Sequence, residues 1–314
     1  MLCIVKKRNF KAGLFYLARV IPCTTPNLLP MWSVIIKPSH PLLRPYILEY
    51  SLRSISIPDG QTQTMVMPLW CLSTIDFFLS GYCGTADLNT GHEQPFCRSV
   101  IRGMRTSCSS YLCLRGQVVV FNVKLTPNGL HSLFAIPAYK FTDRVIDTGL
   151  MCSPVSFTAI SRQLADCHNI DDCVAVIEPH LLKLLRNTEG HVQLSGSSTQ
   201  MLHLINSSKV PQRISSLKKD VYISQRQLQN LFLEEIGTTP KRYSRMVRFT
   251  NMVYQKVLLP GQSWASLAYE FGYCDQRHLI GDFRYFLGIT PGQFVSDDFH
   301  CIVESMPASF FPSR

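Results

Sequence analysis

The sequence predicts an α+β protein of two domains, in which a β-rich N-terminal domain precedes an all-α domain. Its 314 residues are about twice the length of a common single domain. From about Trp32 to Leu150, short β-branched and aromatic runs alternate with Pro, Gly, Ser and Thr. Examples are TIDFFLSG (74–81), which is expected to stop at Gly81, and GQVVVFNVKLTPNG (116–129). Beyond these runs, apolar residues recur every three or four positions, which is the period of an amphipathic helix.

Two amphipathic stretches after the strands predict a helical hairpin over residues 156–187. Apolar residues line one face of each stretch, in SFTAISRQLADCHN and in DDCVAVIEPHLLKLLRN. Pro179 lies inside the second pattern and is expected to kink or break that helix. We expect the hairpin to pack on the sheet or to bridge to the next domain. The polar, Ser- and Gly-rich segment behind it is expected to be a linker.

The chain divides into five predicted segments. No small-residue cleavage site follows the basic N-terminal stretch, and no apolar run reaches the length of a membrane helix, so neither a signal peptide nor a membrane anchor is expected. Residues 1–30 are expected either to be a disordered extension or to lie before the natural start of the protein at Met31. The segments are an N-terminal extension (1–30), a β-rich domain (31–190), a linker (191–198), a helical domain (199–296) and a flexible tail (297–314).

Charge and cysteine usage narrow the class of protein. The net charge is +10, and residues 209–295 carry +6 of it from twelve basic and six acidic side chains, which suits a polyanionic partner. The twelve cysteines include no Cys-x-x-Cys pair, which indicates a reduced, cytoplasmic protein with buried thiols. No metal site or other cofactor is expected, because the closest groupings lack the paired spacing of zinc modules. These groupings are Cys108/Cys113 and Cys167/His168/Cys173.

An internal repeat organises the helical domain. The stretch SQRQLQNLFLEEIGTTP (224–240) aligns with DQRHLIGDFRYFLGITP (275–291), because both continue with Gln-Arg, place Phe at the ninth position and end in Gly-x-Thr-Pro. Each copy follows a shorter predicted helix, at 214–219 and at 264–271, and a turn. Each copy also begins with an N-cap residue type and ends in a Gly and a Pro that stop a helix. A duplicated helix-turn-helix is the economical interpretation.

Each repeated helix has an apolar face for the preceding helix and an outward polar face. Arg, Gln and Asn make paired hydrogen bonds with guanine and adenine edges in the major groove of DNA. Polar helix faces are common, but two matched copies in the most basic part of the chain favour DNA readout. The outward residues are Arg226, Gln229 and Asn230 in the first copy, and Gln276, Arg277, His278, Gly281 and Arg284 in the second.

Residues 196–296 resemble the tandem helix-turn-helix DNA-binding domain of the AraC/XylS family of bacterial transcription regulators, most closely in SLAYEFGYCDQRHLIGDFRYFLGITPGQF. The resemblance implies seven helices, with a long linker helix over 241–259 that holds two recognition helices about one DNA turn apart. It also implies roles for individual side chains. Base-facing roles fall to Arg226, Gln229, Asn230, Gln276, Arg277, His278 and Gly281. Separately, phosphate contacts are expected from Ser224, Lys241, Arg242 and Arg284.

Upstream, residues 35–190 are similar to a β-rich N-terminal domain of such regulators, whose usual role is effector sensing or dimerisation. The similarity is carried by VVVFNVKLTPNGLHSLFAIPAYKFTDRVIDTGL (118–150) and the hairpin behind it. The implied function is a sequence-specific, DNA-binding transcription regulator without catalytic residues. Double-stranded DNA is the implied partner, with RNA polymerase and an undefined small-molecule effector as further candidates. This interpretation fits either a monomer or a homodimer, and either activation or repression of transcription.

Two other classes stay open. One is a DNA-binding module fused to a cysteine-dependent enzyme, which an activated thiolate of low pKa would favour. Against it, the sequence has no Gly-x-Ser-x-Gly, phosphate loop or His-Glu-x-x-His, and His40, His92 and His131 are isolated. The other is an interaction protein with degenerate DNA binding, suggested by Leu233 and Gly281. Aromatic residues of the β-rich region are expected to be core rather than pocket: Trp32, Trp70, Phe77, Phe78, Phe121 and Phe134.

Overall fold

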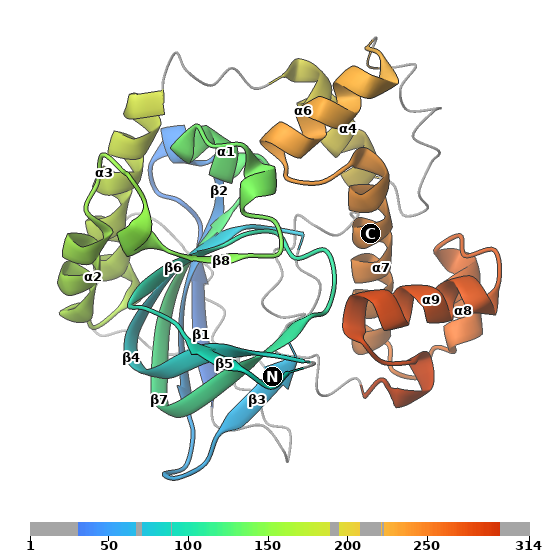
Figure 1. The fold of residues 1–314 in the computed structure, drawn as a ribbon, viewed down its shortest axis with the longest axis horizontal. Coiled ribbons are helices and arrows are strands. Elements are labelled where there is room, and N and C mark those ends of the chain that lie inside the picture. Colours follow the sequence, from blue (N-terminus) through green and yellow to red (C-terminus); the bar gives the residue numbers. More distant parts are fainter. Residues whose placement is uncertain are drawn as a thin grey trace, which may run out of the picture.

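The computed structural model describes residues 31–66, 71–88, 90–188, 195–207, 221 and 223–295. A sheet with helices along one side forms the β-domain (31–188), and a group of helices beside it forms the helical domain (195–295) (Figure 1). The predicted extension, the start of the linker (191–194), the helix at 214–219 and the tail lie outside the described residues. Within those residues, no helix has both the length and the apolar character needed to cross a membrane.

The β-domain is built on one antiparallel sheet. The strand order is β1-β2-β7-β4-β6-β8, with β3 paired to β7 and β5 paired to β4. Along β7, Phe121 and Val123 face the apolar core while Asn122 and Lys124 point to the opposite side, as expected for the two-residue period of a strand. The strands are β1 (Met31–Ile36), β2 (Ile47–Ser56), β3 (Gln63–Val66), β4 (Thr74–Asp87), β5 (Glu93–Pro95), β6 (Ser99–Arg102), β7 (Ser110–Leu125) and β8 (Val145–Asp147).

Strand β4 does not stop at Gly81, so this prediction is wrong. The strand continues to Asp87, with register shifts against β7 on both sides of Ser80. Gly81 has a φ of +74°, and a Cβ added there would lie 2.6 Å from the carbonyl oxygen of Gln117. The glycine therefore permits an irregularity inside a long, bent strand rather than its end.

The predicted hairpin is present and packs on the sheet (Figure 1). Phe157 of the first hairpin helix stacks on Phe77 of β4, with ring centroids 6.3 Å apart. The second hairpin helix runs unbroken through Pro179, so of the expected kink or break the break is wrong. Both Pro179 and Ala175, whose carbonyl loses its helical partner, are exposed, so water can satisfy that carbonyl. The helices on the sheet are α1 (Gly129–Phe134), α2 (Phe157–Ala165) and α3 (Ile170–Thr188).

Of the six aromatic residues expected in the core, two are fully buried and two are partly buried against apolar clusters. Phe77 and Phe121 are fully buried in the core between sheet and hairpin, and Phe134 packs against it. Phe78 packs against a smaller apolar cluster on the other side of the sheet. The side chains of Trp32 and Trp70 lie outside the described part of the structure.

The described helices of the second domain begin and end close to the positions that the sequence predicts. Its first helix begins at Gly196, three residues before the expected start at 199. The long helix runs from Pro240 to Leu258, within one residue of the expected range at each end. The described helices are α4 (Gly196–Asn206), α6 (Gln225–Glu235), α7 (Pro240–Leu258), α8 (Trp264–Glu270) and α9 (Gln276–Leu287).

One continuous apolar core joins the two helix-turn-helix motifs and reaches into the β-domain. Phe232 of α6 and Phe283 of α9 belong to the same buried cluster. Cys71, Leu72 and Met104 of the β-domain are part of it as well. The two domains therefore share buried apolar contacts in this structure, an arrangement that the sequence does not predict.

Candidate nucleic-acid interface

Helix α6 has the caps and the apolar face that the repeat predicts. Its N-cap is a capping box, in which the Ser224 hydroxyl accepts from the Gln227 amide (3.2 Å) and the Gln227 side chain accepts from the Ser224 amide (3.0 Å). Leu228 and Phe232 are buried, and Gly237 follows the helix with a φ of +97°. The three base-facing candidates of the first copy, Arg226, Gln229 and Asn230, are all exposed.

Helix α9 repeats this arrangement. The Asp275 carboxylate accepts from the amide of His278 (2.7 Å), and Gly288, with a φ of +71°, caps the end. Leu279, Phe283 and Phe286 are buried. Exposed positions of the second copy are Gln276, Arg277, Gly281 and Arg284. A Cβ added at Gly281 would meet nothing within 4 Å, so the glycine leaves an open gap in the exposed face.

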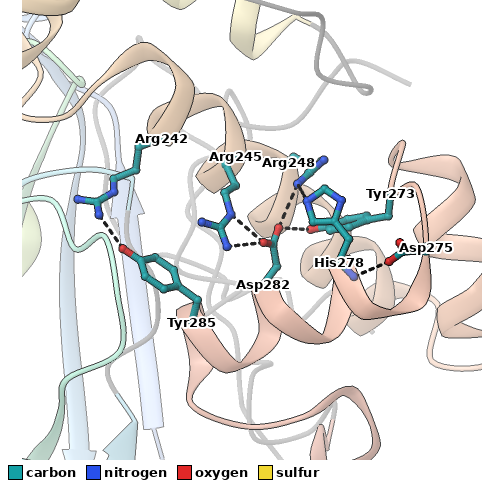
Figure 2. Close-up of polar contacts among 8 residues, drawn as sticks. All are labelled: Arg242, Arg245, Arg248, Tyr273, Asp275, His278, Asp282 and Tyr285. Atoms are coloured by element: carbon teal, nitrogen blue, oxygen red, sulfur yellow. Dashed lines mark hydrogen bonds and ion pairs between the residues drawn. The ribbon is translucent and has the colours of Figure 1, made fainter.

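His278 differs from the other base-facing candidates, because its ring is turned toward α7 (Figure 2). Its Nε2 lies 3.0 Å from Nη2 of Arg248, and the ring packs edge-on against Tyr273 at a centroid distance of 5.0 Å. Arginine can only donate, so Nε2 of His278 is the acceptor in this contact. In this arrangement His278 orients neighbouring groups rather than facing outward.

A buried carboxylate joins α9 to α7. Asp282 is fully buried and is contacted by Arg245 and Arg248 of α7 and by the Tyr273 hydroxyl (Figure 2). Nε and Nη2 of Arg245 both lie 2.7 Å from Oδ1, whereas Arg248 Nη2 (3.1 Å) and the Tyr273 hydroxyl (2.9 Å) donate to Oδ2. Burial raises the pKa of Tyr273, so its hydroxyl stays protonated and available as a donor.

The pair of arginines also packs on aromatic rings of the second motif. The Arg248 guanidinium lies 4.1 Å from the centroid of the Tyr273 ring, and that of Arg245 lies 4.8 Å from the Tyr285 centroid. These groups fix α9 to α7 through charge, hydrogen bonds and stacking. Sequence reasoning missed them, although a signal was present. Arginines recur at every third position in α7, at 242, 245 and 248, and so share one face of the helix.

The proposed phosphate contacts lie in different surroundings. Lys241 and Arg284 are exposed, and Ser224 is exposed at the N-terminus of α6. Arg242 is exposed too, but its guanidinium donates to the Tyr285 hydroxyl (2.8 Å) and contacts the Thr106 hydroxyl of the β-domain (3.5 Å). Only part of the donor capacity of Arg242 is therefore directed to solvent.

Three buried cysteines of the described residues do not fit the role of a nucleophile. Burial raises the pKa of the Cys71 and Cys83 thiols to about 12 in each case, and burial also raises the pKa of Cys173 to about 12. A raised pKa lowers the thiolate fraction that such chemistry requires. In the described part of the chain, no group of three or more His, Cys, Asp or Glu side chains is placed to hold a metal ion.

Comparison with known proteins identifies the second domain. Residues 217–297 match the sequence profile of a family described as a helix-turn-helix domain. No curated protein matches the chain. Similar solved structures include ToxT from Vibrio cholerae (9% identity, covering 78% of this chain and 97% of that chain, TM-score 0.44). Another is ToxT from Vibrio cholerae O395, with 10% identity, 78% of this chain and 96% of that chain covered, and a TM-score of 0.42. A third is unsaturated fatty acid bound wild-type ToxT from Vibrio cholerae strain SCE256, with 9% identity, 77% of this chain and 93% of that chain covered, and a TM-score of 0.42. At these identities and TM-scores the likeness carries no functional argument.

Proposed function

We propose that this chain, whose residues 217–297 form an AraC-type helix-turn-helix domain, is a sequence-specific DNA-binding transcription regulator. The observation that carries the proposal is the pair of matched helices, α6 and α9, which are capped alike, packed on the same long helix α7, and exposed along faces rich in Arg, Gln and Asn. Each of these helices would enter the major groove and read one of two adjacent elements.

The chemistry of the exposed faces suits base readout. Arg226 and Arg277 have the forked donors that pair with O6 and N7 of guanine, whereas Gln229, Asn230 and Gln276 have the amides that pair with adenine. Gly281 would let the backbone of α9 approach the bases closely. Because its ring faces α7, His278 is proposed to support this face rather than to contact bases directly.

The length of α7 is compatible with two adjacent major-groove segments. Its 19 residues span roughly 28 Å at about 1.5 Å per residue. Successive major-groove segments on one face of DNA lie about 34 Å apart. A single rigid helix of this length can therefore hold the two recognition helices near the same face of the duplex.

Phosphate contacts would add affinity without sequence preference. Lys241 and Arg284 are exposed near the two recognition helices, and Ser224 has its hydroxyl at a helix N-terminus, where anions are favoured. Arg242 is proposed as a weaker phosphate contact, since Tyr285 and Thr106 share its donors. The β-domain would sense an effector or form a dimer, and RNA polymerase is a further proposed partner.

The test is selection of genomic DNA fragments by the purified full chain, followed by binding titrations over a salt series. Arg226→Ala and Arg277→Ala each remove one proposed base contact, and Arg162→Ala, at an exposed position of α2, is a control with the same charge change. The expected result is one motif of two elements about 10 base pairs apart. Each test variant should weaken readout at its own element, by roughly 5- to 100-fold, while the control leaves binding unchanged.

Recovery of binding that is sensitive to salt but indifferent to sequence would overturn the proposal. It would mean that the exposed faces of α6 and α9 contact only phosphates. Equal losses in the two test variants and in Arg162→Ala would lead to the same conclusion, because they would reflect net charge alone.

A further inference from the structure

Two loops of the β-domain are bound to each other next to the helical domain. They are residues 103–109, between β6 and β7, and residues 138–144, which lead into β8; together they are called the bracket. The Asp143 carboxylate accepts from both the amide (2.7 Å) and the hydroxyl (2.6 Å) of Thr106. The Asp143 amide donates to the carbonyl of Met104 (2.9 Å). These three hydrogen bonds fix one loop against the other.

The backbone of the bracket is unusual at two positions. Asp143 has a φ of +57°, in the left-handed region that non-glycine residues adopt rarely and Asp or Asn most readily. A Cβ added at Gly103 would lie 1.9 Å from the carbonyl oxygen of Phe141, so the two loops meet at a distance that only glycine permits. The two loops are therefore packed against each other through backbone as well as side-chain groups.

The bracket contacts the end of the first recognition helix. The Thr142 hydroxyl donates to the carbonyl of Gly237 (2.7 Å), the residue that follows the C-cap of α6. A Cβ added at Gly237 would lie 2.6 Å from the Thr142 hydroxyl and 3.1 Å from the Ala138 carbonyl oxygen. The end of α6 is therefore held in van der Waals contact with the β-domain.

The bracket also contacts the end of the second recognition helix. The Cys108 amide donates to the carbonyl of Tyr285 in α9 (3.4 Å). Arg242 links the two domains again, because it reaches the Tyr285 hydroxyl with one nitrogen and the Thr106 hydroxyl with another. Figure 2 shows the Arg242–Tyr285 contact between α7 and α9.

We infer that the bracket fixes the spacing and relative orientation of α6 and α9, and thereby the spacing of the two DNA elements that the protein accepts. Thr106 and Asp143 are the positioning residues, since Thr106 joins Asp143 inside the bracket to Arg242 outside it. The inference rests on the proposed DNA-binding function. It differs from a merely structural role, because it predicts a change in spacing preference and not a uniform loss of affinity.

The experiment compares full-length variants on a panel of DNA duplexes. The selected two-element site is prepared with its native spacing and with one base pair removed or one or two added. Asp143→Gly keeps the left-handed backbone accessible but deletes the carboxylate, and Thr106→Val removes the hydroxyl with little change in shape. Asp143→Asn keeps an acceptor and the left-handed preference, so it should rescue in part. Thr158→Val, at an exposed position of α2, is the matched control.

The wild type and the control are expected to lose roughly tenfold or more in affinity when the spacing changes by one base pair, since one element then loses its contacts. Asp143→Gly and Thr106→Val should bind the altered spacings within about threefold of the native one. Both variants should still require the base sequence of each element. Thr106→Val is the milder change and keeps the test usable if Asp143→Gly does not fold.

Two results separate the failure of this inference from failure of the proposed function. If folded variants, checked by melting temperature, keep the sharp spacing preference of the wild type, α7 alone sets the spacing and the inference is overturned. If the wild type itself binds no two-element site, the proposed function fails and the inference fails with it.

Discussion

Replacement of Asp282 by Asn tests how strongly α9 is fixed to α7. The carboxylate is fully buried and accepts from Arg245, Arg248 and Tyr273. Asn keeps the shape of the side chain but removes the charge, and its amide group must then face at least one of these donors. The variant therefore leaves two arginines without their counter-charge while creating no cavity.

The magnitude follows from how far each arginine can return to water. Removing one partner of a buried ion pair costs about 3–5 kcal/mol. The Arg248 side chain is only 10% exposed, so this cost applies to it nearly in full, whereas Arg245 is 39% exposed and is partly solvated already. Asn retains one acceptor oxygen. Together these considerations give a loss of roughly 2–4 kcal/mol in the free energy of unfolding.

Urea denaturation followed by the fluorescence of Trp264 measures this loss of stability with a probe that contacts α9. The Trp264 ring lies 4.7 Å from that of Phe283 in α9, and replacing Trp32 and Trp70 by Phe removes the other tryptophan signals. Asp59→Asn, in an exposed turn, is the control with the same charge change and should alter stability by less than about 0.5 kcal/mol. A loss for Asp282→Asn no larger than that of the control would refute the reasoning.

Three further predictions concern backbone, cap and buried charge. Gly237→Ala should destabilise the protein by at least about 1–2 kcal/mol, because Gly237 has a positive φ and contacts the bracket. Gly281→Ala should stabilise it by up to about 1 kcal/mol, because the added methyl group meets open space inside a helix. Melting temperatures that move in the same direction for both variants would contradict this. Ser224→Ala should cost about 1 kcal/mol through loss of the capping box, measured by urea denaturation, and an unchanged midpoint would argue against the box. Lys124→Met should lower the free energy of unfolding by about 3–5 kcal/mol, because buried Glu49 loses its closest partner. The double variant with Glu49→Leu should regain most of this stability. A double-mutant cycle that shows no coupling energy between the two positions would exclude a cooperative pair.

The helix boundaries of the second domain could be predicted because their signals are local. Ser224 and Asp275 cap helices, and Gly237 and Gly288 adopt the positive φ that ends them, regardless of what surrounds the helix. The irregularity at Gly81 could not be predicted in this way. A glycine after an apolar run signals the end of a strand as readily as a bend within it, and pairing with the distant strand β7 decides between them.

The polar faces of the candidate site could likewise be predicted from helical periodicity, but the contacts of Asp282 and His278 with α7 could not. No pattern within α9 indicates a partner for Asp282, and only the packing of α7 places Arg245 and Arg248 opposite it. The same packing turns His278 inward. Contacts between elements 30 or more residues apart depend on tertiary arrangement, which the period of one helix does not encode.

The continuous core around α7 has a consequence for how the second domain unfolds. Helices α6 and α9 bury their apolar faces against the same long helix, and no separate core serves either motif among the described residues. Loss of one motif would expose apolar surface on α7 that the other motif also uses. The two helix-turn-helix motifs are therefore expected to melt in a single cooperative transition. Partial damage to one motif would then reach the other as a loss of folding rather than stay an isolated defect.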